Sequence, residues 1–149
     1  MRIRLLWADD DCERNLEPLG WLLEEDFDFD LVKARNYKDA MSLLAENRDD
    51  ESRRIQSLLL DTILPHAEGG ASLSRYLGLT LAKEGAELGV RAVVFLSVVP
   101  QAEVRQHYFD LKNKFPHISW NYVNKADLLE FHQIKALVEY LSDTIVHSK

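Results

Sequence analysis

Five polar residues come directly or shortly after apolar runs and could act together in one chemical site. These residues are Asp9, Asp10, Asp61, Ser97 and Lys125. Carboxylates brought close together repel one another and raise one another's pKa unless a cation lies among them. A set of oxygen donors with a hydroxyl and an ammonium nearby suits Mg²⁺ rather than zinc. The five histidines and the single cysteine, Cys12, show no spacing that would form a competing metal site. The residue types therefore indicate a magnesium-dependent carboxylate site.

The stretch from residue 57 to residue 70 is the most informative part of the chain. Its apolar run, residues 58–60, is too short for a surface helix and is typical of a buried parallel strand. The run ends at Asp61, and Pro65 with Gly69 and Gly70 marks the loop that follows. Open α/β sheets bind ligands at the carboxyl ends of their strands, so Asp61 is well placed for chemistry. Taken alone, Asp61 could equally cap the turn.

Strand-like and helix-like segments alternate five times along the chain. The predicted strands are residues 3–8, 29–34, 58–60, 91–96 and 118–123. Helical stripes follow each of them: Leu16, Leu19 and Leu23; Tyr37, Ala40, Met41 and Leu44; Leu73, Leu77 and Leu81; Val104, Tyr108, Leu111 and Phe115; Ile134, Leu137, Val138, Leu141 and Ile145. This alternation predicts an α/β fold with a parallel sheet and helices on both faces.

Local signals suggest where these helices begin and end. Asn15 is a candidate N-cap for the first helix, and Asn36 with Asp39 resembles a capping box before the second. Gly85 is expected to stop the third helix. Asp127 with Glu130 is expected to form a capping box for the last helix. The charged run of residues 47–54 indicates a solvated loop.

Bulk composition indicates one soluble intracellular domain, residues 1–149. The chain has 149 residues, which is enough for one core, and 46% of them are hydrophobic. The net charge of −7 disfavours binding to nucleic acid or to an anionic membrane surface. No apolar run is long enough to span a membrane, and the lone cysteine demands no oxidising compartment.

With these marks in order, the chain resembles the receiver domain of two-component response regulators over residues 2–142. Receivers carry an acidic pair after the first strand, as at Asp9 and Asp10. They carry an acceptor aspartate followed by proline four and glycine eight residues on, then a hydroxyl residue and a lysine after the next strands. The matching residues are Asp61, Pro65, Gly69, Ser97 and Lys125, with the aromatic Tyr122 three positions before the lysine.

The resemblance implies a flavodoxin-like five-stranded sheet of order 2-1-3-4-5 and a phosphoryl switch. Asp61 would take a phosphoryl group from a histidine kinase or a phosphotransfer protein. Mg²⁺ would bind Asp10, Asp61 and the carbonyl of Ile63 directly, and Asp9 through water. Ser97 and Lys125 would contact phosphoryl oxygens, and Ser97 with Tyr122 would switch a surface that binds a downstream target. A cytoplasmic location follows, and the resemblance leaves room for a homodimer.

Each of the matched residues could also have an ordinary structural role, and two other functions are alternatives to the phosphoryl switch. Asp9 to Asp11 could be a helix-entry charge cluster, Ser97 a turn residue, Lys125 a solvated lysine and Tyr122 a packing residue. Val98 and Ala126 depart from the receiver pattern, which normally has a small residue and a proline there, so a scaffold that works without phosphorylation is the main alternative. A phosphohydrolase of the haloacid-dehalogenase kind would need an aspartate where this chain has Ile63.

Overall fold

The computed structural model describes residues 3–10, 17–26, 29–47, 54–67, 76–128 and 130–147. Its five strands are β1 (Arg4–Ala8), β2 (Asp30–Ala34), β3 (Ser57–Leu60), β4 (Ala92–Ser97) and β5 (Ser119–Asn124). They form one parallel sheet of order β2-β1-β3-β4-β5, as predicted. The α/β, flavodoxin-like class is therefore confirmed.

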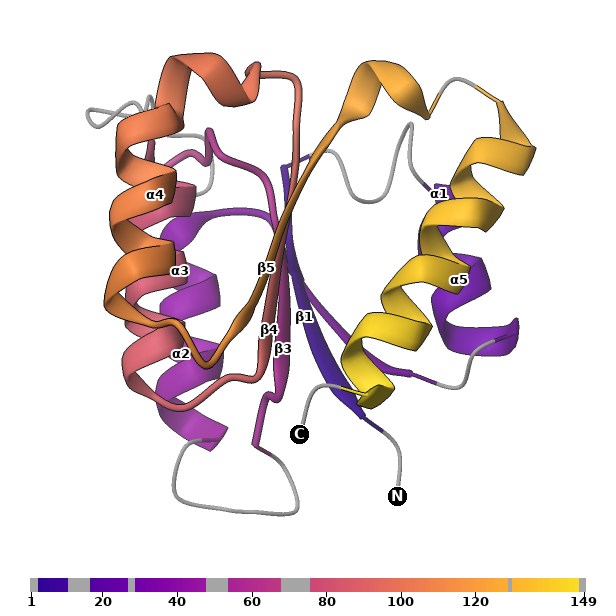
Figure 1. Cartoon of the computed structure of the whole chain (residues 1–149). Coiled ribbons are helices and arrows are strands. Elements are labelled where there is room, and N and C mark those ends of the chain that lie inside the picture. The colour runs from indigo at the N-terminus through magenta and orange to yellow at the C-terminus, as the bar shows by residue number, and fades with distance from the viewer. Residues whose placement is uncertain are drawn as a thin grey trace.

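Helices cover both faces of this sheet. The α-helices are α1 (Glu17–Trp21), α2 (Tyr37–Asn47), α3 (Leu77–Glu87), α4 (Arg105–Lys114) and α5 (Phe131–His147). A π-helical segment, η1 (Leu22–Asp26), continues α1, and two 3-10 helices, η2 (Gln101–Val104) and η3 (Lys125–Asp127), precede α4 and α5. Figure 1 shows α2, α3 and α4 on one side of the sheet and α1 and α5 on the other.

The strands are buried on both faces, so neighbouring residues of one strand point into different cores. Leu58 and Leu60 of β3 join the core under α2, α3 and α4, whereas Leu59 joins the core under α1 and α5. All three leucines are at most 1% exposed. This alternation explains why β3 is an unbroken apolar run rather than an amphipathic one.

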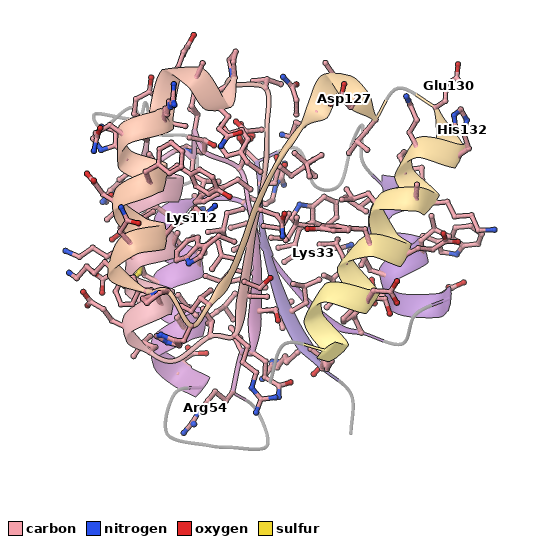
Figure 2. All side chains as sticks on the ribbon, in the orientation of Figure 1. Lys33, Arg54, Lys112, Asp127, Glu130 and His132 are labelled. Carbon is pink, nitrogen blue, oxygen red and sulfur yellow. The ribbon has the colours of Figure 1, made fainter. Side chains whose placement is uncertain are left out.

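Several charged side chains can be located on the outside of the fold. Figure 2 places Arg54, which precedes β3, at the end of the molecule opposite Asp127, the last residue of η3. Glu130 also lies toward the outside, just before α5, whereas the half-buried Lys112 lies over the Tyr108 ring. Among the described helices, none is long and apolar enough to cross a membrane.

Two of the expected helix boundaries are wrong. Gly85 does not stop α3, because it is buried inside the helix against the Leu58 side chain, and the left-handed glycine is Gly89 (φ 93°) after the helix end. Asp127 belongs to η3 and does not cap α5. Instead, Gln133 Oε1 accepts a hydrogen bond from the Glu130 backbone amide (2.9 Å), which is one half of a capping box placed three residues later.

The cap before α2 is confirmed, with one difference. Asn36 Oδ1 accepts a hydrogen bond from the Asp39 amide (2.8 Å), and the Asn36 side-chain amide, rather than its backbone, donates to Asp39 Oδ2 (3.0 Å). Several sequence features lie outside the described residues: Asp11, Cys12, Asn15, Leu16, most of the charged loop (48–53), Gly69, Gly70 and Leu73.

Candidate functional site

Strand register brings two of the predicted acids side by side. Ala8 of β1 pairs with Leu60 of β3, so Asp9 and Asp61 each follow a paired residue by one position. Their backbones continue the ladder, because the Asp61 amide donates to the Ala8 carbonyl (2.9 Å) and the Asp9 amide donates to the Ala34 carbonyl (2.9 Å). Both side chains therefore leave the sheet at the same edge, at 0% exposure for Asp9 and 5% for Asp61.

Three carboxylates meet at this edge. One oxygen each from Asp9, Asp10 and Asp61 lies within 4.8 Å of the others, and Asp10 is the exposed member. The donor set is made of carboxylate oxygens only, which fits a hard divalent cation with an accessible coordination position at Asp10. Within the described residues, these three aspartates are the cluster that could hold a metal ion.

Lys125 bridges the two buried carboxylates. Its Nζ atom lies 2.8 Å from Asp9 Oδ2 and 2.9 Å from Asp61 Oδ2, and its side chain is 14% exposed. Burial works to lower the pKa of Lys125, but the negative charges of Asp61 and Asp9 outweigh it and hold that pKa above its usual value. Lys125 is therefore a fully charged ammonium at neutral pH.

Burial and neighbouring groups act in opposite directions on the pKa of Asp61. Burial raises the pKa of Asp61, Lys125 opposes this rise as a charge and a hydrogen-bond donor, and the negative charge of Asp10 adds to it. The Ile63 amide also donates weakly to Asp61 Oδ1 (3.4 Å). Burial outweighs these partners, so the pKa of Asp61 stays above its usual value, and a cation added near Asp10 would favour its charged form.

Ser97 and Tyr122 lie on the paired strands β4 and β5 and make hydrogen bonds to residues other than the three aspartates and Lys125. Ser97 ends β4 opposite Asn124 of β5, is fully buried, and accepts a hydrogen bond at Oγ from the Val99 amide (3.0 Å). Tyr122 lies in β5, and its hydroxyl group reaches across to Thr62 and Val99. The expected functional roles of both residues stay predictions.

The two departures from the receiver pattern have structural consequences. The loop that carries Lys125 lacks a proline at Ala126, but Asn124 Oδ1 accepts a hydrogen bond from the Ala126 amide (2.9 Å) and fixes the same turn. Val98 is 64% exposed and Ile63 is 38% exposed, so both apolar side chains lie on the solvent side of the site. Two exposed apolar side chains therefore lie in the loops that follow Asp61 and Ser97.

Sequence reasoning missed Gly78. Its amide donates to the Thr62 carbonyl (3.0 Å), and a β-carbon at position 78 would collide with the Asp61 carbonyl oxygen and lie 2.8 Å from the Thr62 Cα. The N-terminal turn of α3 can therefore rest on the backbone that carries Asp61 only if residue 78 is glycine. No local pattern in the sequence reveals this long-range contact.

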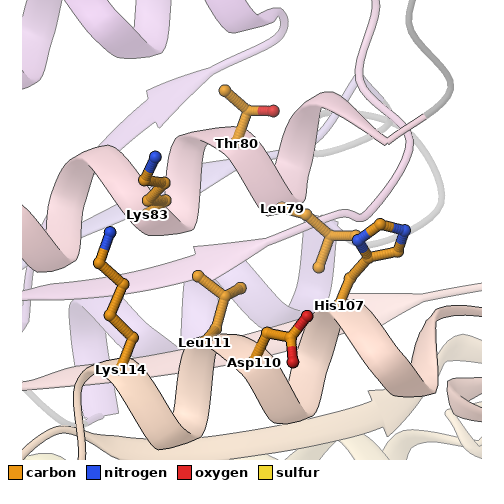
Figure 3. Close-up of a pocket in the computed structure, with 7 residues that line it drawn as sticks. All are labelled: Leu79, Thr80, Lys83, His107, Asp110, Leu111 and Lys114. Carbon is orange, nitrogen blue, oxygen red and sulfur yellow. The ribbon is translucent and has the colours of Figure 1, made fainter.

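A separate pocket of about 260 Å³ lies between α3 and α4 (Figure 3). It has an apolar floor of Leu79 and Leu111 and charged walls that include Lys83 and Lys114. None of the predicted site residues lines it. The carboxylate cluster and this pocket are therefore different places on the molecule.

Known structures share this fold. The phosphorylated cyanobacterial phytochrome response regulator RcpA superposes with a TM-score of 0.70 at 17% identity, over 100% of this chain and 97% of its own. The Mn²⁺-bound response regulator Rcp1 gives 0.67 at 18% identity, over 96% of each chain. A CheY-like receiver domain protein from Methanospirillum hungatei gives 0.64 at 15% identity, over 96% of this chain and 95% of its own. No protein-family model and no curated protein sequence matches the chain.

These likenesses define the class of fold. The chain has the fold of response-regulator receiver domains, with the strand order and the two helical layers that this fold requires. The resemblance to receivers is confirmed at that level. At identities of 14–18% across the similar structures, what the site does has to be argued from its own residues.

Proposed function

We propose that this protein is a phospho-acceptor receiver that takes a phosphoryl group onto Asp61 in a two-component phosphorelay. The observation that carries the proposal is the Asp61 carboxylate held by Lys125 beside Asp9 and Asp10 at the edge of a receiver sheet. We also propose that residues 1–149 act as one receiver domain, because all the described helices pack on a single sheet. A cytoplasmic location is part of the same proposal.

The proposed step is an in-line transfer from a phosphohistidine. A new bond forms between an Asp61 carboxylate oxygen and phosphorus, the P–N bond breaks, and its electron pair leaves with the imidazole nitrogen, which takes up a proton. Such transfers need positioning and neutralisation of oxygen charge more than covalent machinery. Lys125 already lies against Asp61, so it can pair with a phosphoryl oxygen after only a small shift.

The residues present fit a divalent cation. Asp10 and Asp61 would hold Mg²⁺ with the Ile63 carbonyl, and Asp9 would do so through water, while the ion would supply neutralisation of the phosphoryl oxygens. The description of Rcp1 as Mn²⁺-bound supports a cation in this fold, and that of RcpA as phosphorylated supports an acceptor. Ser97 would donate a hydrogen bond to the phosphoryl group. Tyr122, together with Ser97, would then switch the surface that binds a downstream target.

The partners follow from the chemistry. The donor would be a histidine kinase or a histidine phosphotransfer protein, and the phosphorylated form would bind a downstream target protein. Asp61 is 5% exposed, whereas Asp10, Val98 and Ile63 close to it in sequence or in the site are exposed and would meet a donor protein. These exposed apolar side chains offer contact area for a docking protein.

The test is labelling with phosphoramidate, a small donor with a P–N bond, in the presence and absence of Mg²⁺. Intact-mass spectrometry should show the gain of one phosphoryl group that requires Mg²⁺ and is lost in Asp61→Asn. Equal labelling of Asp61→Asn would overturn the proposal. An unlabelled wild type that still binds Mg²⁺ would favour the scaffold function, in which the same fold binds a partner without phosphorylation.

A further inference from the structure

A series of hydrogen bonds, joined through the backbone of Val99, connects Thr62, the residue after Asp61, with Ser97. The Tyr122 hydroxyl donates to the Val99 carbonyl at 2.6 Å and also lies 3.2 Å from Thr62 Oγ1. A phenol carries one hydrogen, which the shorter bond to Val99 uses, so Thr62 must donate to the Tyr122 oxygen. The Val99 amide in turn donates to Ser97 Oγ (3.0 Å).

The residues that form this series of hydrogen bonds are held in place by the core. Thr62 and Ser97 are both fully buried. The Tyr122 ring packs against Phe95 and Tyr108, with ring centroids 5.6 and 5.7 Å apart. Because the Thr62 carbonyl accepts the Gly78 amide (3.0 Å), the Thr62 backbone is held by α3 and its hydroxyl has a defined place. Buried, mutually satisfied polar groups of this kind favour a single arrangement.

The same series of hydrogen bonds restricts the direction in which the Ser97 hydroxyl can donate. Its oxygen already accepts the Val99 amide, so its one hydrogen points away from that amide and is free to donate elsewhere. The Val99 carbonyl is held at the same time by Tyr122, which fixes the peptide units on both sides of Val99. A change in Thr62 therefore reaches Ser97 through three hydrogen bonds, Thr62–Tyr122, Tyr122–Val99 and Val99–Ser97, and through the backbone of Val99.

We propose that Thr62 is a positioning residue for the phosphoryl site: through Tyr122 and Val99 it holds the Ser97 hydroxyl ready to donate to a phosphoryl group on Asp61. This inference rests on the proposed function and adds a residue that the receiver resemblance does not assign. It also gives Tyr122 a defined role in the unphosphorylated state, since its hydroxyl closes the link between the loop after β3 and the loop after β4.

Four variants test the link without altering Asp61, Ser97 or Lys125. Thr62→Val removes the donor and keeps the shape, Thr62→Ser keeps the donor, and Tyr122→Phe removes the central hydroxyl. Tyr108→Phe is the matched control, because Tyr108 lies in the same ring cluster and, within the described part of the chain, no hydrogen bond of its hydroxyl connects it to this network.

The first measurement needs no phosphorylation. In ¹H–¹⁵N spectra, Thr62→Val and Tyr122→Phe should both shift the amide signals of Val99 and Ser97, whereas Thr62→Ser and Tyr108→Phe should leave them nearly in place. Unchanged Val99 and Ser97 signals in Thr62→Val would overturn the inference, whatever the protein does with a phosphodonor.

The second measurement is the rate of phosphoramidate labelling with Mg²⁺. Thr62→Val should slow labelling about fivefold, the effect of one neutral hydrogen bond, and Thr62→Ser should restore it. Equal rates in wild type and Thr62→Val would overturn the role in phosphorylation. A wild type that is never labelled overturns the proposed function and this role with it, while the amide shifts still decide whether the hydrogen-bond chain exists.

Discussion

The Lys125 ammonium donates a 2.9 Å hydrogen bond to Asp61 Oδ2 from a position 64 residues further along the chain. The same ammonium lies 2.8 Å from Asp9, whose side chain is fully buried. Two buried carboxylates therefore share the Lys125 ammonium as a partner. The site is both the candidate place of chemistry and a determinant of stability.

Lys125→Met should lower the free energy of unfolding by about 3 kcal/mol at neutral pH, because it removes the ammonium that both buried carboxylates contact. The raised pKa of Lys125 means that its stabilising effect is complete below the usual value of 10.5 and is lost as the pH rises through the folded-state value. Urea unfolding measures the change.

The matched control for this variant is Lys83→Met, an exposed lysine at the pocket between α3 and α4, which should change stability by less than about 0.5 kcal/mol. The deficit of Lys125→Met should shrink in acid, where Asp61, whose pKa is raised, takes up a proton. A loss of stability that is the same in acid and at neutral pH would argue against the ion-pair explanation.

Asp61→Asn should raise the free energy of unfolding at neutral pH. The pKa of Asp61 is raised in the folded protein, mainly by burial, so the ionised side chain disfavours folding and a neutral amide relieves this cost. The gain should be complete above the folded-state pKa and should vanish as the pH falls below the usual value of 3.8, where both states are protonated. Denaturant unfolding across the acid range measures it, with the exposed Asp110→Asn as control; a destabilised Asp61→Asn would refute it.

Mg²⁺ should stabilise the wild type and quench or shift its tryptophan fluorescence with saturable binding. At a hundredfold excess over the dissociation constant the expected gain is about 2.7 kcal/mol. Asp10→Ala should abolish it, because Asp10 is the exposed acid of the cluster, while Asp110→Ala on α4 should bind as wild type does. Undiminished binding by Asp10→Ala would remove the cluster as the metal site.

Gly78→Ala should destabilise the protein by about 3 kcal/mol and slow labelling of Asp61. The new methyl group would collide with the Asp61 carbonyl, and either α3 or the backbone that carries the acceptor has to move. Gly89→Ala is the comparison: its β-carbon would meet nothing within 4 Å, so only backbone strain of about 1 kcal/mol is expected, with normal labelling. Similar effects of the two substitutions would contradict this contact.

Most of the fold could be predicted from the sequence because parallel strands are buried on both faces. That burial produces an apolar run such as residues 58–60, and it places Asp9 and Asp61 at one edge once the strands are known to be parallel. The contact between Lys125 and these acids is consistent with the predicted convergence. What each residue does chemically stays a prediction.

The errors and omissions concern contacts between distant residues. Gly85 resembles a helix stop locally, but the residue is glycine because the Leu58 side chain leaves no room for a β-carbon. Gly78 against Asp61 and Thr62 against Tyr122 have no local signature either, since their partners are far apart in sequence. The last helix lacks the expected Asp127 cap because residues 125–127 form their own 3-10 turn around the Asn124 cap.

The central claim is that Asp61 is the phosphoryl acceptor, and mapping the labelled residue tests it most directly. Wild type is treated with phosphoramidate and Mg²⁺, digested under mildly acidic conditions, and analysed by tandem mass spectrometry beside Asp61→Asn and Asp10→Ala. The account predicts a single phosphoryl group on Asp61, absent from Asp61→Asn and strongly reduced in Asp10→Ala. A phosphoryl group on another residue, or a fully labelled Asp61→Asn, would contradict it.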